Sequence, residues 1–199
     1  MSIQVIVFDF DGTLVESDRL KFEAFFELFP KDNVHDRVIR RVFSECPEAS
    51  RYVMLEQILR TLDQYRDDGP KRVQELAGRY NEIVVSAAQT CPECPGAEAV
   101  LKDLVPDYCC YLSSATPEEP LQEIVAFRGW TDYFQQIFGY PRKKPDTLCN
   151  IFEREGVTPQ QVVVVGNGES DRVSAEVSGC HFYDVNQKPL IALRAFLNE

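Results

Sequence analysis

The stretch QVIVFDFDGTLV, residues 4–15, governs the interpretation of the whole chain. Its β-branched, apolar beginning, Gln4–Phe10, predicts a buried parallel strand. Asp9 and Asp11 stand two residues apart at the end of this run, and Gly12 lets the backbone turn away so that both carboxylates stay at the strand's carboxyl end. Open α/β sheets bind their ligands at that end. Because close carboxylates repel each other unless a cation or a proton lies between them, the pattern predicts Mg²⁺ and unequal acid and base roles. The alternative interpretation is a solvated turn between a strand and a loop.

Further apolar runs alternate with helical patterns along the remainder of the chain. Strands are predicted over Gln4–Phe10, Tyr108–Leu112, Gln161–Val165 and Cys180–Val185, and helices over Ala97–Leu104, Pro117–Arg128, Pro145–Glu155 and Ser170–Ser178. Pro117 and Pro145 suit first-turn positions, while Gly129, Gly156 and Gly179 suit helix stops. This alternation predicts an α/β fold with a Rossmann-like open parallel sheet and helices on both faces.

Residues 16–94 interrupt that alternation. The segment carries Leu, Phe, Ile, Arg and Glu at helical spacing and has no strand pattern, with expected breaks near Pro30, Pro47 and 67–70. We therefore expect an α/β core built from residues 1–15 and 95–199, with a small all-helical domain inserted at 16–94.

Composition narrows the classes of partner. The chain has 199 residues, 44% of them hydrophobic, and a formal net charge of -11, which argues against nucleic acid or an anionic membrane as the main partner. No apolar run approaches the roughly 20 residues that span a bilayer, so a cytoplasmic location is expected; oligomeric state stays open. Seven scattered cysteines do not form a secreted disulfide framework, and the CxxC of Cys91 and Cys94 lacks the second pair or histidines that a structural zinc site needs.

The DFDGTLV motif at residues 9–15 resembles that of the haloacid dehalogenase-like superfamily, whose phosphatases begin with a hydrophobic strand followed by DxDGT. The resemblance covers residues 1–15 and 95–199. It implies that Asp9 is the nucleophile that forms an aspartyl-phosphate, and that Asp11 is the general acid and base. It also implies that Gly12 and Thr13 contact substrate, and that the helical insertion is a cap that closes over the site and selects the substrate.

Three further motifs fit the same family. Within SSATP, residues 113–117, the resemblance favours Ser114 over Ser113 as the hydroxyl that binds the phosphoryl group, with Ala115 beside it. Taken alone, this stretch is typical of a helix N-cap, with Thr116 as the capping residue.

Within RKKPD, residues 142–146, Lys144 is favoured over Lys143 as the cation that neutralises the phosphoryl group. Within VVVVGNGESD, residues 162–171, the family's GDxxxD pattern has Asn167 in place of its first acid and retains Asp171. Because an amide oxygen supplies no charge, this departure is expected to weaken metal binding or to shift it towards Asp171.

The sequence thus predicts a Mg²⁺-dependent phosphatase that hydrolyses a small phosphorylated metabolite. The expected metal ligands are Asp9, Asp11, Asn167 and Asp171, and the expected catalytic residues are Asp9, Asp11, Ser114 and Lys144. A phosphomutase of the same superfamily is the first alternative. A catalytically weak relative that binds a phosphorylated ligand or a protein is the second, motivated by Asn167. Dehalogenation is less favoured because that branch does not need Asp11.

Overall fold

The computed structural model describes residues 3–46 and 49–198. The chain divides into two compact units, which we call the α/β unit (Met1–Ser17 and Ala88–Glu199) and the helical unit (Asp18–Ala87). Each is described by itself below. The predicted break at Pro47 lies outside the described residues.

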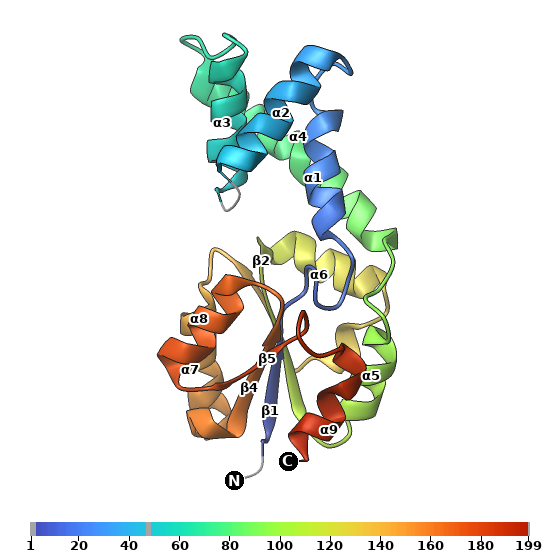
Figure 1. The fold of residues 1–199 in the computed structure, drawn as a ribbon. Coiled ribbons are helices and arrows are strands. Elements are labelled where there is room, and N and C mark those ends of the chain that lie inside the picture. The colour runs from blue at the N-terminus through green and yellow to red at the C-terminus, as the bar shows by residue number, and fades with distance from the viewer. Residues whose placement is uncertain (1–2, 47–48, 199) are drawn as a thin grey trace. The chain divides into compact units, whose positions relative to one another are not determined.

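The α/β unit is built on one five-stranded parallel sheet with the order β3-β2-β1-β4-β5 (Figure 1). Its strands are β1 (Val5–Phe8), β2 (Cys109–Pro117), β3 (Ile137–Tyr140), β4 (Val162–Gly166) and β5 (His181–Asp184). Its helices are α5 (Ala97–Leu104), α6 (Glu118–Phe127), α7 (Lys144–Glu155), α8 (Glu169–Ser178) and α9 (Leu193–Leu197), with short 3₁₀ turns η1 (Thr131–Tyr133), η2 (Pro159–Gln161) and η3 (Leu190–Ala192). The α/β fold class expected from the sequence is confirmed.

Helices cover both faces of this sheet. In Figure 1, α7 and α8 lie on one side of the strands, whereas α5, α6 and α9 lie on the other. On the first side, alternate residues of β1, Val5 and Val7, join Leu148 and Ile151 of α7 and Ala175 of α8 in one buried cluster. Successive side chains of a strand point to opposite faces of the sheet. Because helices cover both faces, every β1 residue is buried, as expected for a central parallel strand.

Two differences from the predicted elements have local causes. Strand β3 carries a weak sequence signal because it has four residues, contains Gly139 and is an edge strand that pairs with β2. Gly139 is needed there, since a Cβ atom would lie 2.4 Å from the Cα of Glu118. Strand β2 continues beyond the predicted end at Leu112 because Ser113 and Pro117 pair with β3 across an irregular register.

The predicted helix stops are confirmed at all three glycines, which have positive φ angles: 70° at Gly129, 64° at Gly156 and 74° at Gly179. The prolines sit slightly differently from the prediction. Pro145 is the second residue of α7, whereas Pro117 occupies the N-cap position of α6 instead of its first turn.

The helical unit consists of α1 (Asp18–Glu27), α2 (Asn33–Glu45), α3 (Arg51–Thr61) and α4 (Gly69–Thr90), the last of which runs on into the α/β unit. It has a hydrophobic core of its own. Buried members of this core come from all four helices and include Phe25, Ile39, Leu55 and Ala77. The all-helical character expected for this part of the chain is therefore confirmed.

Two connecting segments of the α/β unit run side by side. The N–H of Glu16 donates to the carbonyl of Pro92 over 3.0 Å, and the N–H of Cys94 donates to the carbonyl of Leu14 over 2.9 Å.

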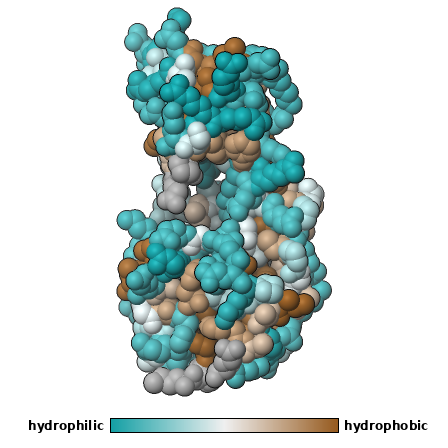
Figure 2. Space-filling model, viewed as in Figure 1, coloured by the Kyte–Doolittle hydropathy of each residue, from teal (hydrophilic) through white to brown (hydrophobic). Residues whose placement is uncertain are grey.

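On the face in Figure 2, hydrophilic side chains predominate and hydrophobic ones form small, scattered patches. None of the helices in the described part of the chain is long and apolar enough to cross a bilayer, and the cytoplasmic location stays a prediction.

Candidate active site

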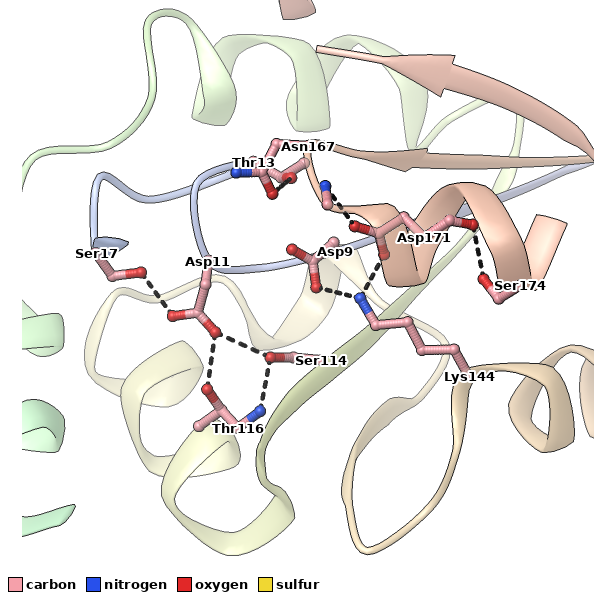
Figure 3. Close-up of polar contacts among 11 residues, drawn as sticks. Asp9, Asp11, Thr13, Ser17, Ser114, Thr116, Lys144, Asn167, Asp171 and Ser174 are labelled. Atoms are coloured by element: carbon pink, nitrogen blue, oxygen red, sulfur yellow. Dashed lines mark hydrogen bonds and ion pairs between the residues drawn. The ribbon is translucent and has the colours of Figure 1, made fainter. Parts of the chain in front are cut away.

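The carboxyl ends of β1, β2 and β4 and the start of α7 bring the candidate residues together (Figure 3). Asp9 directly follows β1, and its N–H donates to the carbonyl of Val165 in β4 over 2.8 Å. This bond continues the strand pairing by one residue, so the Asp9 backbone is fixed to the sheet. The side chain is buried, with 7% of the residue's surface exposed.

The loop after Asp9 turns back on itself. The carbonyl of Phe10 accepts from the N–H groups of Leu14 at 2.9 Å and Val15 at 3.2 Å. Gly12 has a φ of 70°, a region that favours glycine, and its N–H donates to the carbonyl of Val15. The turn leaves both Asp9 and Asp11 at the end of the sheet, as the sequence predicts.

Lys144, the first residue of α7, joins two buried carboxylates. Its Nζ donates to Oδ1 of Asp9 over 2.7 Å and also contacts Oδ1 of Asp171, so one ammonium group lies between two acids. Burial raises the pKa of Asp9 to about 7; Lys144 opposes this rise, and the charges of Asp171 and Asp11 add to it. Burial alone would lower the pKa of Lys144, but the two carboxylates outweigh it and raise that pKa. Lys143, the alternative, is exposed.

Asp171 is held from several sides. It lies in the first turn of α8, only 1% of its surface is exposed, and its Oδ2 accepts from the N–H of Gly168 over 3.1 Å. Gly166, the last residue of β4, gives Asp171 its space, because a Cβ at this glycine would lie 2.3 Å from the Asp171 carboxyl carbon. A residue without a side chain is therefore required at position 166 for the Asp171 carboxylate to reach Lys144.

Asp11 has a different environment, made of hydroxyl groups. Its Oδ1 accepts from Ser17 Oγ over 2.6 Å, while its Oδ2 accepts from Ser114 Oγ over 3.1 Å and Thr116 Oγ1 over 2.8 Å. The interpretation of Thr116 as a helix N-cap is wrong. Pro117 holds the N-cap position of α6, which has no side-chain cap, and the Thr116 hydroxyl points to Asp11 instead (Figure 3).

The two serines of β2 face different surroundings. Ser114 contacts Asp11, whereas Ser113 lines a cavity of about 10 Å³ together with Asp9, Lys144 and Asp171. A cavity of that size holds about one water molecule, which is too little for a phosphoryl group. The geometry therefore does not give Ser113 a substrate-binding position in this cavity.

The other residues predicted for the site are Thr13, Asn167 and Ala115. Thr13 is fully buried and its Oγ1 donates to Oδ1 of Asn167 over 3.5 Å. The backbone of Asn167 is also held, since its carbonyl accepts from Asn186 Nδ2 over 2.7 Å. Ala115, expected beside the phosphoryl group, is exposed.

Sequence reasoning missed two hydroxyl groups of the site, those of Ser17 and Thr116. The predicted insertion, residues 16–94, includes Ser17, yet Ser17 is buried and belongs to the α/β unit. For Thr116, the local sequence suggests only a capping role. Its position two residues after Ser114, at the end of a strand, is the available signal, because alternate strand residues share a face.

The chain is similar to known proteins over most of its length. Residues 6–185 match the family model of the haloacid dehalogenase-like hydrolases. Relatives of assigned function include the phosphoglycolate phosphatase of Vibrio vulnificus, 25% identical over 89% of this chain and 81% of the relative. The phosphoglycolate phosphatase of Psychrobacter arcticus is 22% identical, over 88% of this chain and 80% of the relative.

Solved structures share the fold. A haloacid dehalogenase-family hydrolase from Bacillus subtilis bound to magnesium aligns over 100% of both chains, with a TM-score of 0.77 and 16% identity. A Haemophilus somnus protein assigned as a phosphoglycolate phosphatase covers 98% of each chain, with a TM-score of 0.77 and 17% identity. A Thermotoga maritima protein assigned as a β-phosphoglucomutase covers 92% of this chain and 85% of its own, with a TM-score of 0.69 and 19% identity. Because the family model spans most of the sequence, the chain belongs to the haloacid dehalogenase-like hydrolase family.

Proposed function

We propose that this chain is a phosphatase that hydrolyses a small phosphorylated metabolite through an aspartyl-phosphate on Asp9. Its membership of a hydrolase family and the phosphoglycolate phosphatases among its relatives support this activity and make 2-phosphoglycolate the first substrate to test. The helical unit would act as the cap that selects the substrate, since it is inserted between the Asp9 motif and β2 and has its own core.

The contrast between the partners of Asp9 and Asp11 carries the proposal. Asp9 contacts an ammonium group, which can only donate hydrogen bonds and so stabilises the ionised carboxylate against the effect of burial. Asp11 contacts hydroxyl groups, which can donate to a carboxylate and accept from a carboxylic acid. The first setting suits a nucleophile, and the second suits a residue that gains and loses a proton during turnover.

The proposed reaction has two steps. In the first, an oxygen of Asp9 forms a bond to phosphorus, the ester P–O bond breaks, and the leaving oxygen keeps the electron pair and takes a proton from Asp11. In the second, Asp11 takes a proton from water as the water oxygen attacks phosphorus, and the bond between Asp9 and phosphorus breaks to release inorganic phosphate. Lys144 orients Asp9 through Oδ1 and, with Ser114, would bind the phosphoryl oxygens.

The oxygen donors near Asp9 suit a Mg²⁺ ion in chemical type. Within residues 3–46 and 49–198, no group of three or more His, Cys, Asp and Glu side chains is placed so that it could hold a metal ion by itself. The carboxylates of Asp9 and Asp171 would therefore be joined by the main-chain carbonyl of Asp11 and the side-chain oxygen of Asn167. The surplus of buried negative charge over the single ammonium of Lys144 favours such an ion. When bound, Mg²⁺ supplies positive charge that stabilises the phosphoryl oxygens.

Phosphate release tests the proposed activity. Wild type should release phosphate from 2-phosphoglycolate and from 4-nitrophenyl phosphate with Mg²⁺ and not with a chelator. Asp9→Asn should lower turnover by about 10³-fold or more, because the nucleophile is lost. Asp132→Asn, the same change at an exposed position of the α/β unit, should leave turnover unchanged. Near-normal turnover in Asp9→Asn would exclude Asp9 as the nucleophile. With a sugar monophosphate as substrate, transfer of the phosphoryl group to a second sugar hydroxyl instead of water would indicate a phosphomutase.

Stability against pH tests the metal site without any turnover. The pKa of Asp9 is about 7 in the folded protein against 3.8 for the ordinary group, so protonated Asp9 contributes stability that is lost as the pH rises from about 4 to about 7. With chelator, the free energy of unfolding of wild type should therefore fall relative to that of Asp9→Asn over this range. Excess Mg²⁺ should make this fall in the free energy of unfolding of wild type, relative to Asp9→Asn, smaller near pH 7. If chemical denaturation gives the same fall with and without Mg²⁺, the ion does not bind beside Asp9.

Asn167 tests the alternative of a catalytically weak relative. Asn167→Asp adds a carboxylate to the proposed ligand set, so the Mg²⁺ concentration for half-maximal phosphate release should fall by about 10-fold. Asn150→Asp, at an exposed position of α7, controls for the added charge and should have no such effect. An unchanged Mg²⁺ requirement in Asn167→Asp would show that Asn167 does not limit metal binding, and a turnover that appears only in this variant would favour the weak relative.

A further inference from the structure

Thr116 links the two polar groups that the proposed mechanism uses on this side of the site. Its N–H donates to Ser114 Oγ over 3.0 Å, and its Oγ1 donates to Asp11 Oδ2 over 2.8 Å. Ser114 Oγ in turn donates to the same Asp11 oxygen over 3.1 Å. The three residues thus form a closed hydrogen-bonded ring, visible in Figure 3.

The two hydroxyl-bearing members of the ring are buried, while Asp11 is half-buried. Ser114 exposes 2% of its surface and Thr116 exposes 7%, so water competes little for these hydrogen bonds. The other oxygen of Asp11 is held by Ser17, which is fully buried. Since both carboxylate oxygens have partners, rotation of the Asp11 carboxylate is restricted.

The backbone around Thr116 explains why its hydroxyl is available for Asp11. A threonine just before a helix commonly caps it, but here Pro117 takes the N-cap position of α6 and no side chain caps the helix. The register between β2 and β3 shifts between Ser113 and Pro117. This irregularity lies at the position where the chain presents the Thr116 hydroxyl to the site.

We propose that Thr116 is a positioning residue that holds Asp11 where it can protonate the leaving oxygen. The inference rests on the proposed phosphatase function and adds a residue to it. When the ester P–O bond breaks, the leaving oxygen keeps the electron pair and receives the proton of Asp11, so the product is a neutral hydroxyl group. A small displacement of Asp11 slows this proton transfer most for a strongly basic leaving oxygen.

The choice of leaving group separates this role from a merely structural one. The alkoxide that leaves 2-phosphoglycolate needs a proton, whereas 4-nitrophenolate leaves without one. Thr116→Val keeps the branched shape and the N–H but removes the hydroxyl. It should lower kcat/KM, which reports formation of the aspartyl-phosphate and not its shared hydrolysis, by about 10- to 100-fold for 2-phosphoglycolate and by less than about 3-fold for 4-nitrophenyl phosphate.

Matched variants complete the experiment. Thr116→Ser restores the hydroxyl and should recover most of the kcat/KM for 2-phosphoglycolate. Thr158→Val makes the same change just before η2, at the amino end of β4 and so at the opposite edge of the sheet, and should change neither rate. Thermal unfolding of each variant verifies that it is folded, and Thr116→Ala replaces Thr116→Val if the valine variant does not fold.

Each outcome decides between the inference and the proposed function. An equal loss for both substrates in Thr116→Val, or no loss for either, would overturn the positioning role while leaving the phosphatase function intact. Failure of Thr116→Ser to recover the rate would also overturn it. If wild type hydrolyses neither substrate with Mg²⁺, the proposed function itself fails, and the role of Thr116 fails with it.

Discussion

The ammonium group of Lys144 lies between the buried carboxylates of Asp9 and Asp171, and the rest of the site is arranged around this contact. Burying two acids is costly unless they are paired, so the fold must bring a cation to them. It does so because β1 and β4 end, and α7 starts, at the same side of the sheet, where the carboxyl ends of the strands lie. Asp11, two residues beyond Asp9, then faces hydroxyl groups instead of the ammonium. The same side of the sheet thereby provides two acids with different chemistry.

Much of the fold follows from the sequence because the central strands are uniformly apolar. Every residue of β1 and β4 is buried, and such runs, separated by helical patterns, leave few alternatives to a parallel sheet. The sequence does not predict the edge strand β3, because Gly139 and Pro141 are residues typical of a turn. Strand β2 was predicted too short because its end is polar, although pairing with β3 extends it to Pro117.

The candidate site was predictable where a residue stands next to a strand end and not where tertiary contacts decide its role. Asp9, Lys144 and Asp171 come together as the motifs imply. Thr116 looked like a helix cap because local sequence does not show that Pro117 takes that position. Ser17 looked like the start of the insertion, since its contact with Asp11 depends on how the loop after Gly12 turns back.

The central claim is that Asp9 becomes covalently phosphorylated during turnover. Borohydride reduces an acyl phosphate to an alcohol but leaves a free carboxylate unchanged, so a quench during turnover marks the phosphorylated residue. Wild type mixed with 2-phosphoglycolate and Mg²⁺, quenched with borohydride and analysed by peptide mass spectrometry, should show Asp9 converted to homoserine in a substrate-dependent way. Conversion of Asp11 instead, or phosphate release without any converted aspartate, would contradict this account.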